Sequence, residues 1–312
     1  MIQKIISVFL CMALLASFTG TVAADAPNTV QSKLAAIEKD TYGEEQPGAL
    51  MERLNRLEKD YNGRHNSGSM MERIDEMYGE IYANDGRPSK QALLNAIQWN
   101  IRHEVSAEPV QKCISGLEMD LNGKTGEGTF SERIDALARE SFGEGVPPMV
   151  QTLLPADTLV KIALAEPVSS KSLKAGDRVS FRVAEDTAVD GVLLFVKGAE
   201  GYGTVKKVRP ARNFGRNAEL VIEFEKTKAV DGTYVDTFVG EAAKKKMTNL
   251  AMATGASIAG AVLLGPVGII AGVFVKGKNV ELPAGTEVIL QTRREETLYG
   301  IRMAGRQERR AE

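Results

Sequence analysis

The chain holds few side chains of the kinds that perform catalysis or bind metals. Its two histidines, His65 and His103, are far apart and have no Cys or carboxylate at metal-ligand spacing. No phosphate-binding loop and no nucleophile motif occurs. Asp and Glu pairs are frequent and could serve a hydrolase, but on amphipathic helices they are typical of solvated faces. We therefore predict that the protein is not an enzyme and uses neither a cofactor nor a metal.

Two other features could react or bind through charge. Cys113 could be a reactive or cross-linking thiol, but Lys112 is its only positive neighbour in sequence, which favours an inert, half-buried thiol. Five cations lie close together and could bind an anionic envelope polymer or lipid head group, while a long solvated hairpin loop explains them equally well. These cations are Lys206, Lys207, Arg209, Arg212 and Arg216.

An uncharged segment is the most informative part of the chain. All 29 residues from Met247 to Val275 lack a charge, which is long enough to cross a membrane. Gly265-Pro266 interrupts the run, so an α-hairpin is at least as well supported as one straight helix. Small residues recur every four positions in the pattern of a glycine zipper: Ala251, Gly255, Ala259, Gly268 and Gly272. The pattern favours membrane insertion or oligomerisation, and the alternative is a hairpin buried on its own β domain.

The N-terminus predicts export. Lys4 precedes a short apolar run, and small residues follow up to Ala24, so residues 1–24 are predicted to be a signal peptide cut after Ala24. Bulky residues precede Cys11, which argues against a lipid anchor. The mature chain keeps Cys113 as its one cysteine, so it cannot form an internal disulfide and must be stable by packing.

Composition indicates a globular protein of two domains. Of 312 residues, 43% are apolar and 26% are charged, with a formal net charge of −2. Residues 25–148 carry 14 basic and 22 acidic side chains, whereas residues 149–312 carry 24 and 19. Neither half is basic enough to predict direct binding of nucleic acid.

Residues 25–146 repeat with a period of 20. Six units carry apolar residues at two positions three residues apart, which is helical spacing. The two series are Leu34, Leu54, Ile74, Leu94, Ile114 and Ile134, and Ile37, Leu57, Met77, Ile97, Leu117 and Leu137. Recurrent glycines and the capping boxes at Ser69 and Thr129 bound the units. We predict an array of six helical repeats of about 20 residues that serves as a scaffold or protein-binding surface.

An arginine recurs in the same register of three repeats. Arg53, Arg73 and Arg133 could form a row that binds carboxylates or phosphates. The preferred interpretation is a ladder of ion pairs with nearby glutamates, which contributes little energy where it is exposed. The candidate partners are Glu52, Glu58, Glu72 and Glu132.

Residues 152–292 predict a β domain. Seven short alternating runs are separated by turn signals, and Asp190-Gly191 and Asp231-Gly232 predict hairpin turns. The segments Leu154–Thr158 and Leu282–Thr286 are nearly identical, which indicates two strands that lie close together and close a barrel or sandwich. The apolar α-hairpin is inserted at 247–275, and residues 293–312 are predicted to be an Arg-rich, frayed tail.

The order of these elements resembles the C-terminal β domain of TrbI-like proteins, the outer-membrane core subunits of conjugation and type IV secretion channels. The first two matching segments are LPADTLVKIALAEPVSS and KAGDRVSFRVAEDTAVDGVLLFVKGAEGYGTV. The whole match extends over about residues 154–291. The resemblance implies that the β domain assembles in a ring and that a hairpin at Gly255–Val275 crosses the outer membrane. The signal peptide and the helical repeats depart from that family.

These observations predict an α+β protein with a helical repeat domain and a β domain that carries a glycine-zipper hairpin. We expect a non-enzymatic, exported protein of the bacterial periplasm or outer membrane. Its expected partners are the outer membrane, further copies of itself, and an envelope protein or cell-wall polymer. The alternative is a soluble periplasmic module that binds cell-wall polymer or envelope proteins.

Overall fold

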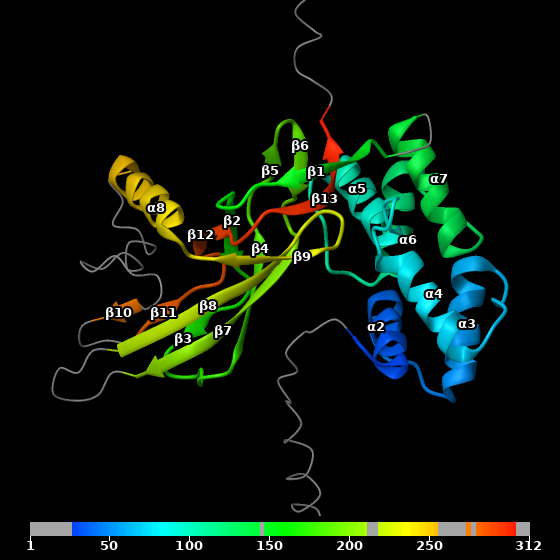
Figure 1. The fold of residues 1–312 in the computed structure, drawn as a ribbon, viewed down its shortest axis with the longest axis horizontal. Coiled ribbons are helices and arrows are strands. Elements are labelled where there is room, and N and C mark those ends of the chain that lie inside the picture. Colours follow the sequence, from blue (N-terminus) through cyan, green and yellow to red (C-terminus); the bar gives the residue numbers. More distant parts are fainter. Residues whose placement is uncertain (1–26, 144–146, 211–217, 255–272, 276–278, 304–312) are drawn as a thin grey trace, which may run out of the picture.

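The computed structural model describes residues 27–143, 147–210, 218–254, 273–275 and 279–303 (Figure 1). Residues 27–143 form six helices, and the residues after them form a β-rich domain, as the sequence predicts. The helices are 13 residues long and begin at intervals of 20 residues. They are α2 (Val30–Tyr42), α3 (Leu50–Asn62), α4 (Met70–Tyr82), α5 (Lys90–Arg102), α6 (Val110–Asn122) and α7 (Phe130–Phe142).

Local chemistry sets the ends of each helix. The side chains of Thr29, Ser69, Ser89 and Thr129 accept hydrogen bonds from first-turn N–H groups. Gly43, Gly63 and Gly123 end their helices in the left-handed conformation. His103 takes the same conformation after α5, with φ 56°.

The six repeats pack around one core. Leu34, Leu54, Ile74, Leu94, Ile114 and Ile134, together with the second apolar series, are buried in one cluster. Helix α2 contacts α4 and α6 as well as α3, and α3 also contacts α7. The repeats therefore close into a compact bundle instead of extending as a stack in which each unit touches only its neighbours.

The β domain is built on a closed barrel of six strands. In the order β8, β7, β4, β2, β12, β9, each strand pairs with the next, and β9 pairs again with β8. These strands are β2 (Leu159–Leu164), β4 (Arg178–Val183), β7 (Glu200–Arg209), β8 (Ala218–Lys228), β9 (Tyr234–Phe238) and β12 (Glu287–Thr292). A second sheet has the order β1 (Met149–Leu154), β13 (Glu296–Arg302), β6 (Val192–Phe195), β5 (Thr187–Val189), and β3 (Val168–Ser169) pairs with β11 (Glu281–Leu282).

The two nearly identical segments lie at opposite ends of one strand pair. Strands β2 and β12 are antiparallel neighbours, which confirms that the strands lie close together. Each segment makes a turn in which a threonine hydroxyl donates to a proline carbonyl, from Thr158 to Pro155 at 2.8 Å and from Thr286 to Pro283 at 2.7 Å. The N–H of Asp157 donates to the carbonyl of Thr292, so the turn before β2 closes the end of β12.

The predicted tail begins instead as part of the fold. Strand β13 covers Glu296–Arg302 and pairs with both β1 and β6. Leu298, Tyr299 and Ile301 are buried there. Arginines at 293, 294 and 302 flank this run, but its apolar residues supply a strand with a core face.

The predicted hairpin at 247–275 begins and ends in regular structure. Helix α8 (Glu241–Thr254) starts before the uncharged run and contains the lysines that precede it, while β10 (Val273–Val275) pairs with β8. The predicted end of the hairpin at Val275 is therefore wrong, because strand pairing has begun by Val273. Ala251 lies in α8, whereas Gly255, Ala259, Gly268 and Gly272 lie outside the described residues.

Candidate functional site at the junction of helices and barrel

Helix α5 and the loop before it bind the barrel through three side-chain donors. The amide of Asn84 donates to the carbonyl of Asp231 at 3.0 Å, and the amide of Asn95 donates to the carbonyl of Val230 at 2.9 Å. Nε1 of Trp99 donates to Oδ2 of Asp186 at 2.8 Å. These contacts fix one helix on two separate turns of the β domain, which prevents rotation about either contact.

Backbone groups complete this junction where two glycines allow close approach. The N–H of Val105 donates to the carbonyl of Lys197 at 2.9 Å. A Cβ on Gly198 would lie 2.0 Å from the carbonyl oxygen of Val105, and one on Gly232 would lie 2.4 Å from Oε1 of Gln91. Both glycines also have a positive φ, so no other residue fits these turns without strain.

Asp231 connects the junction to the second sheet. Its carboxylate is buried and accepts hydrogen bonds from the N–H groups of Thr233 at 3.0 Å and Tyr299 at 2.9 Å. Burial raises the pKa of this carboxyl group above its usual value, although the two N–H donors act in the opposite direction. The same residue therefore holds its own turn, strand β13 and, through its carbonyl, Asn84 of the helical domain.

The recurring arginines pair with glutamates of the preceding repeat. Each Nε lies about 3 Å from a glutamate oxygen 15 residues earlier: Arg53 with Glu38 at 3.0 Å, Arg73 with Glu58 at 2.9 Å and Arg133 with Glu118 at 2.8 Å. These glutamates are buried. The predicted ladder is thus present and Glu58 is one of its partners, but it is buried instead of exposed. Glu52, Glu72 and Glu132 cap helix N-termini.

Two repeats lack both members of this pair. The arginine position is Leu93 in α5 and Cys113 in α6, and the positions 15 residues earlier are Tyr78 and Gln98 instead of glutamate. Gln98 still accepts a hydrogen bond from the loop N–H of Ser106 at 3.0 Å, as Glu118 does from Gly126 at 2.8 Å. The loop contact is therefore kept at Gln98, where the ion pair is lost, and in these two repeats neither member of the arginine–glutamate pair is buried without the other.

The thiol of Cys113 is buried and burial raises its pKa to about 12, which agrees with an inert side chain. His65 lies 3.5 Å from Glu58, and His103 ends α5. Within the described ranges no group of His, Cys, Asp and Glu could hold a metal ion.

The predicted basic loop is in part a strand. Lys206, Lys207 and Arg209 lie in β7, whereas Arg212 and Arg216 lie outside the described residues. Lys206 pairs with Glu223 at 2.9 Å, and Lys207 pairs with Glu219 at 2.7 Å, both on β8. Carboxylates of the neighbouring strand therefore neutralise the described part of this cation cluster.

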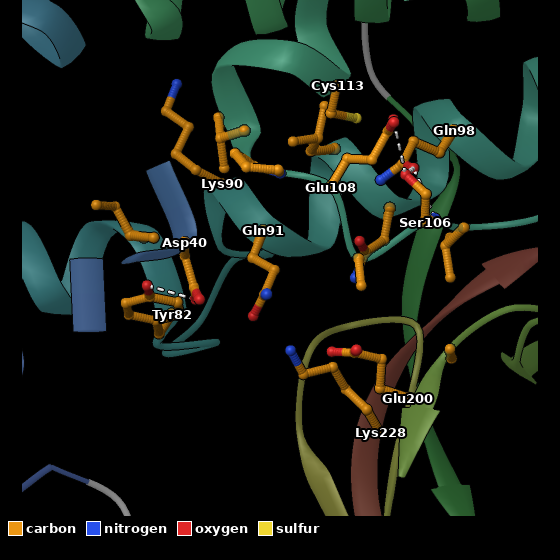
Figure 2. Close-up of a pocket in the computed structure, with 18 of the residues that line it drawn as sticks. Asp40, Tyr82, Lys90, Gln91, Gln98, Ser106, Glu108, Cys113, Glu200 and Lys228 are labelled. Atoms are coloured by element: carbon orange, nitrogen blue, oxygen red, sulfur yellow. Dashed lines mark hydrogen bonds between the residues drawn. The ribbon is translucent and has the colours of Figure 1, made fainter. Parts of the chain in front are cut away.

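A cleft of about 650 Å³ lies beside the junction (Figure 2). Helices α2, α4, α5 and α6 and the loop before α6 form one wall, and the barrel forms the other. Figure 2 shows Gln91 extending from α5 toward the strands that carry Glu200 and Lys228. Buried side chains of the bundle, among them Leu94 and Cys113, line its inner part.

Sequence reasoning did not identify the junction residues. Asn84, Asn95 and Gly232 were not recognised as contacts between domains. A signal was nevertheless present, because the third and fourth repeats have Ala83 and His103 in place of the recurrent glycine. Repeats that depart from their own consensus are candidates for a second packing partner.

In the part of the chain that the structure describes, none of the helices combines the length and apolarity needed to span a membrane. No protein-family model and no curated protein matches the chain. Among solved structures, the chain is similar to ComB10 of the Com type IV secretion system of Helicobacter pylori. The two are 18% identical with a TM-score of 0.24, over 46% of this chain and 88% of that chain.

Proposed function

We propose that this protein is a non-enzymatic scaffold of the bacterial cell envelope. Its β domain anchors or oligomerises at the outer membrane through the uncharged segment, and its helical repeats hold partner proteins in the periplasm. The signal-peptide pattern and the resemblance to the TrbI-like β domain support the location. The observation that carries the proposal is the placement of the two ends of the uncharged segment.

Both ends are attached to the barrel on the side away from the bundle. Figure 1 shows α8 and β10 on that side, opposite helices α2 to α7. The N–H of Ala243 in α8 donates to Gln291 of β12 at 3.1 Å, and β10 pairs with the first residues of β8. A segment that leaves and returns on one side suits an anchor, because the bundle on the other side stays free for partners.

Length limits the kind of anchor. Between Thr254 and Val273 lie the 18 residues 255–272. Even if the uncharged end of α8 (248–254) is added, two helical legs would have about 12 residues and reach only about 19 Å each, whereas the hydrocarbon core is about 30 Å thick. The proposed anchor therefore enters one leaflet or packs against the same segment of another copy, and it does not cross the bilayer twice.

The rigid junction supports a scaffold. Side-chain, backbone and apolar contacts join the two domains, and Ala96 of α5 and Val105 belong to the barrel's own core cluster. A bundle held in one orientation relative to its anchor can present partners at a fixed distance and angle. A flexible linker would not.

Fractionation tests the anchor. We expect the mature protein to pellet with outer membranes, to resist high salt and to dissolve in detergent. A variant with 255–272 replaced by a Gly-Ser segment of the same length should become soluble while the barrel keeps its thermal midpoint. Recovery of the unaltered protein in the soluble fraction without detergent overturns the proposal.

Bulky residues test the zipper. In the Gly255→Leu, Gly272→Leu double variant, overall apolarity rises but close approach is blocked, so membrane partition should persist while the oligomer seen on native gels is lost. The Gly260→Leu, Ala271→Leu double variant also adds two leucines, each one residue away from the nearest small-residue position of its own half of the segment, and serves as the matched control. An unchanged oligomer with a large loss of β-domain stability contradicts the zipper and indicates a buried core position instead.

A further inference from the structure

The cleft between the bundle and the barrel has the features of a binding site that the anchor does not use. Its volume, about 650 Å³, falls in the range of ligand sites, and it lies at a domain boundary, where such sites are common. Its inner part is apolar and reaches buried residues such as Ile81 and Leu94. An apolar group of a ligand can therefore be shielded from water there.

The polar side chains around the cleft are only partly satisfied. Tyr82 donates to Asp40 at 2.8 Å, and Lys90 pairs with Asp135 at 3.3 Å. Among the described residues, the side chains of Lys39, Gln91 and Glu200 make no hydrogen bond or ion pair. The amide of Gln91 has both donors and an acceptor, which matches the N–H and C=O groups of a peptide backbone.

The charges not engaged in ion pairs are of both signs. Among the described residues that line the cleft, Lys39, Asp40 and Glu108 stand on the helical wall without an ion pair, and Lys228 and Glu200 do so on the barrel wall. A polyanion would meet three carboxylates and a polycation would meet two ammonium groups. A ligand that carries one charge of each sign is favoured, and exposed charges of this kind contribute more to selectivity than to affinity.

The aromatic rings argue against a sugar as the ligand. Lys228 lies over the ring of Tyr234, with Nζ 5.1 Å from the ring centroid, and the ring of Tyr82 packs on Tyr78 with centroids 4.7 Å apart. Tyr82 is therefore covered by Tyr78, and Lys228 occupies one face of the exposed ring of Tyr234, where it competes with the stacking of a sugar ring.

We propose that the cleft binds an extended peptide segment of a partner protein, with one apolar side chain in the inner part and flanking residues of opposite charge at the two walls. The inference rests on the proposed scaffold function and names the class of partner.

Peptide selection tests the site. A displayed library of random nonapeptides is selected against the full chain in mild detergent, with the Ala107→Trp variant in excess as soluble competitor. Ala107 is exposed and lines the cleft, so tryptophan there fills the site without changing its charges. We expect enriched peptides with an apolar residue between residues of opposite charge.

The internal repeats supply matched controls. Position 127 is the equivalent of 107 one repeat later and lies outside the cleft, and Lys59 is the equivalent of Lys39. By fluorescence anisotropy of a selected synthetic peptide, Ala107→Trp should weaken binding at least about tenfold and Glu127→Trp should not. Lys39→Glu should weaken it about threefold, and Lys59→Glu should not. Circular dichroism melts verify that each variant is folded. If Ala107→Trp fails to fold, the surface substitution Lys39→Glu still tests the site.

Several outcomes overturn the inference. These are a selection without enrichment, peptides that bind Ala107→Trp or Lys39→Glu as well as the unaltered chain, and peptides of a single charge sign. Soluble cell-wall glycan fragments are the competing class: if they bind with the same dependence on Ala107 and no peptide does, the cleft is a glycan site. A chain that is soluble in fractionation yet binds peptides through the cleft contradicts the anchor and leaves the peptide site intact.

Discussion

Repeats with the buried ion pair differ from the repeat that binds the barrel. In α3, α4 and α7 an arginine lies against a buried glutamate of the repeat before it. Helix α5 has Leu93 at that position and instead carries Asn95 and Trp99, which donate to the β domain. One helical framework thus uses charge to join repeat to repeat and hydrogen-bond donors to join domain to domain. The comparison teaches that loss of the repeat consensus marks the domain contact.

The largest expected effect comes from breaking one buried pair. Arg73→Ala leaves Glu58 charged and fully buried without its partner, so the free energy of unfolding should fall by about 3–5 kcal/mol. Urea denaturation followed by circular dichroism measures this. Arg56→Ala on the same bundle, at an exposed position, should change stability by less than about 0.5 kcal/mol.

The chain itself suggests a compensated replacement. The double variant Arg73→Leu, Glu58→Tyr copies the residues at 93 and 78, and it should recover most of the stability lost in Arg73→Ala. A double variant that is as unstable as the single one would mean that the two sets of repeats are not interchangeable, and the comparison would fail.

A smaller effect is expected at the domain junction. Gly198→Ala places a methyl group against the carbonyl of Val105. It also puts a non-glycine residue at a positive φ, and this backbone strain should lower the free energy of unfolding by about 1–3 kcal/mol. Gly176→Ala has a positive φ but open space around it, so it isolates the strain alone. Trp99 is the single tryptophan, and its emission should shift to the red in Gly198→Ala and stay unchanged in Gly176→Ala. Equal spectra would show that the contact does not hold the domains together.

Two carboxyl groups should respond to pH with opposite sign. Hydrogen bonds from Arg133 lower the pKa of Glu118, so its contribution to stability is present above about pH 4.5 and is lost as the pH falls through its folded pKa. The raised pKa of Asp231 gives a contribution that is present below about pH 3.8 and is lost as the pH rises. Carboxyl carbon NMR should show each titration on its own side of the ordinary value. Glu118→Gln should therefore destabilise at pH 7 and have less effect in acid.

The smallest effect concerns a helix end. His103 adopts a left-handed conformation that glycine adopts at lower cost, so His103→Gly should stabilise the bundle by about 0.5–1 kcal/mol. A thermal melt measures the gain. Gly123→His, the reverse change at the end of α6, should cost a similar amount, and destabilisation by both changes would indicate that the packing of His103 on Trp99 outweighs backbone strain.

Periodic features were predictable from sequence. Two apolar series at 20-residue spacing were enough to locate the six helices, and the likeness of Leu154–Thr158 to Leu282–Thr286 was enough to place two strands together. Such features depend on local spacing, which a single sequence displays directly. The turns at Asp190-Gly191 and Asp231-Gly232 were correct for the same reason.

Contacts that depend on three-dimensional arrangement were not predictable. The partners of Arg53 and Arg133 are 15 residues away, which is neither helical nor β spacing, so neighbouring caps were mistaken for them. The cleft requires the bundle to be docked on the barrel, and the strand at Glu296–Arg302 requires β1 beside it. In each case no local sequence pattern marks the residues, because their contacts depend on segments that only the fold brings together.

The two proline-containing turns, at Leu154–Thr158 and Leu282–Thr286, affect which insertions the barrel can tolerate. Because the turn before β12 is bonded to the end of β2, and Val280 is held by Ser170 at 3.0 Å, the start of the closing strand is positioned independently of the residues between β9 and β11, while α8 adds contacts farther along the strand. That interval behaves as an insertion whose two ends are fixed. Doubling the length of a flexible insertion costs only about 0.6 kcal/mol in closure entropy. The inserted segment can therefore change in length or chemistry while the barrel that holds its two ends keeps its structure.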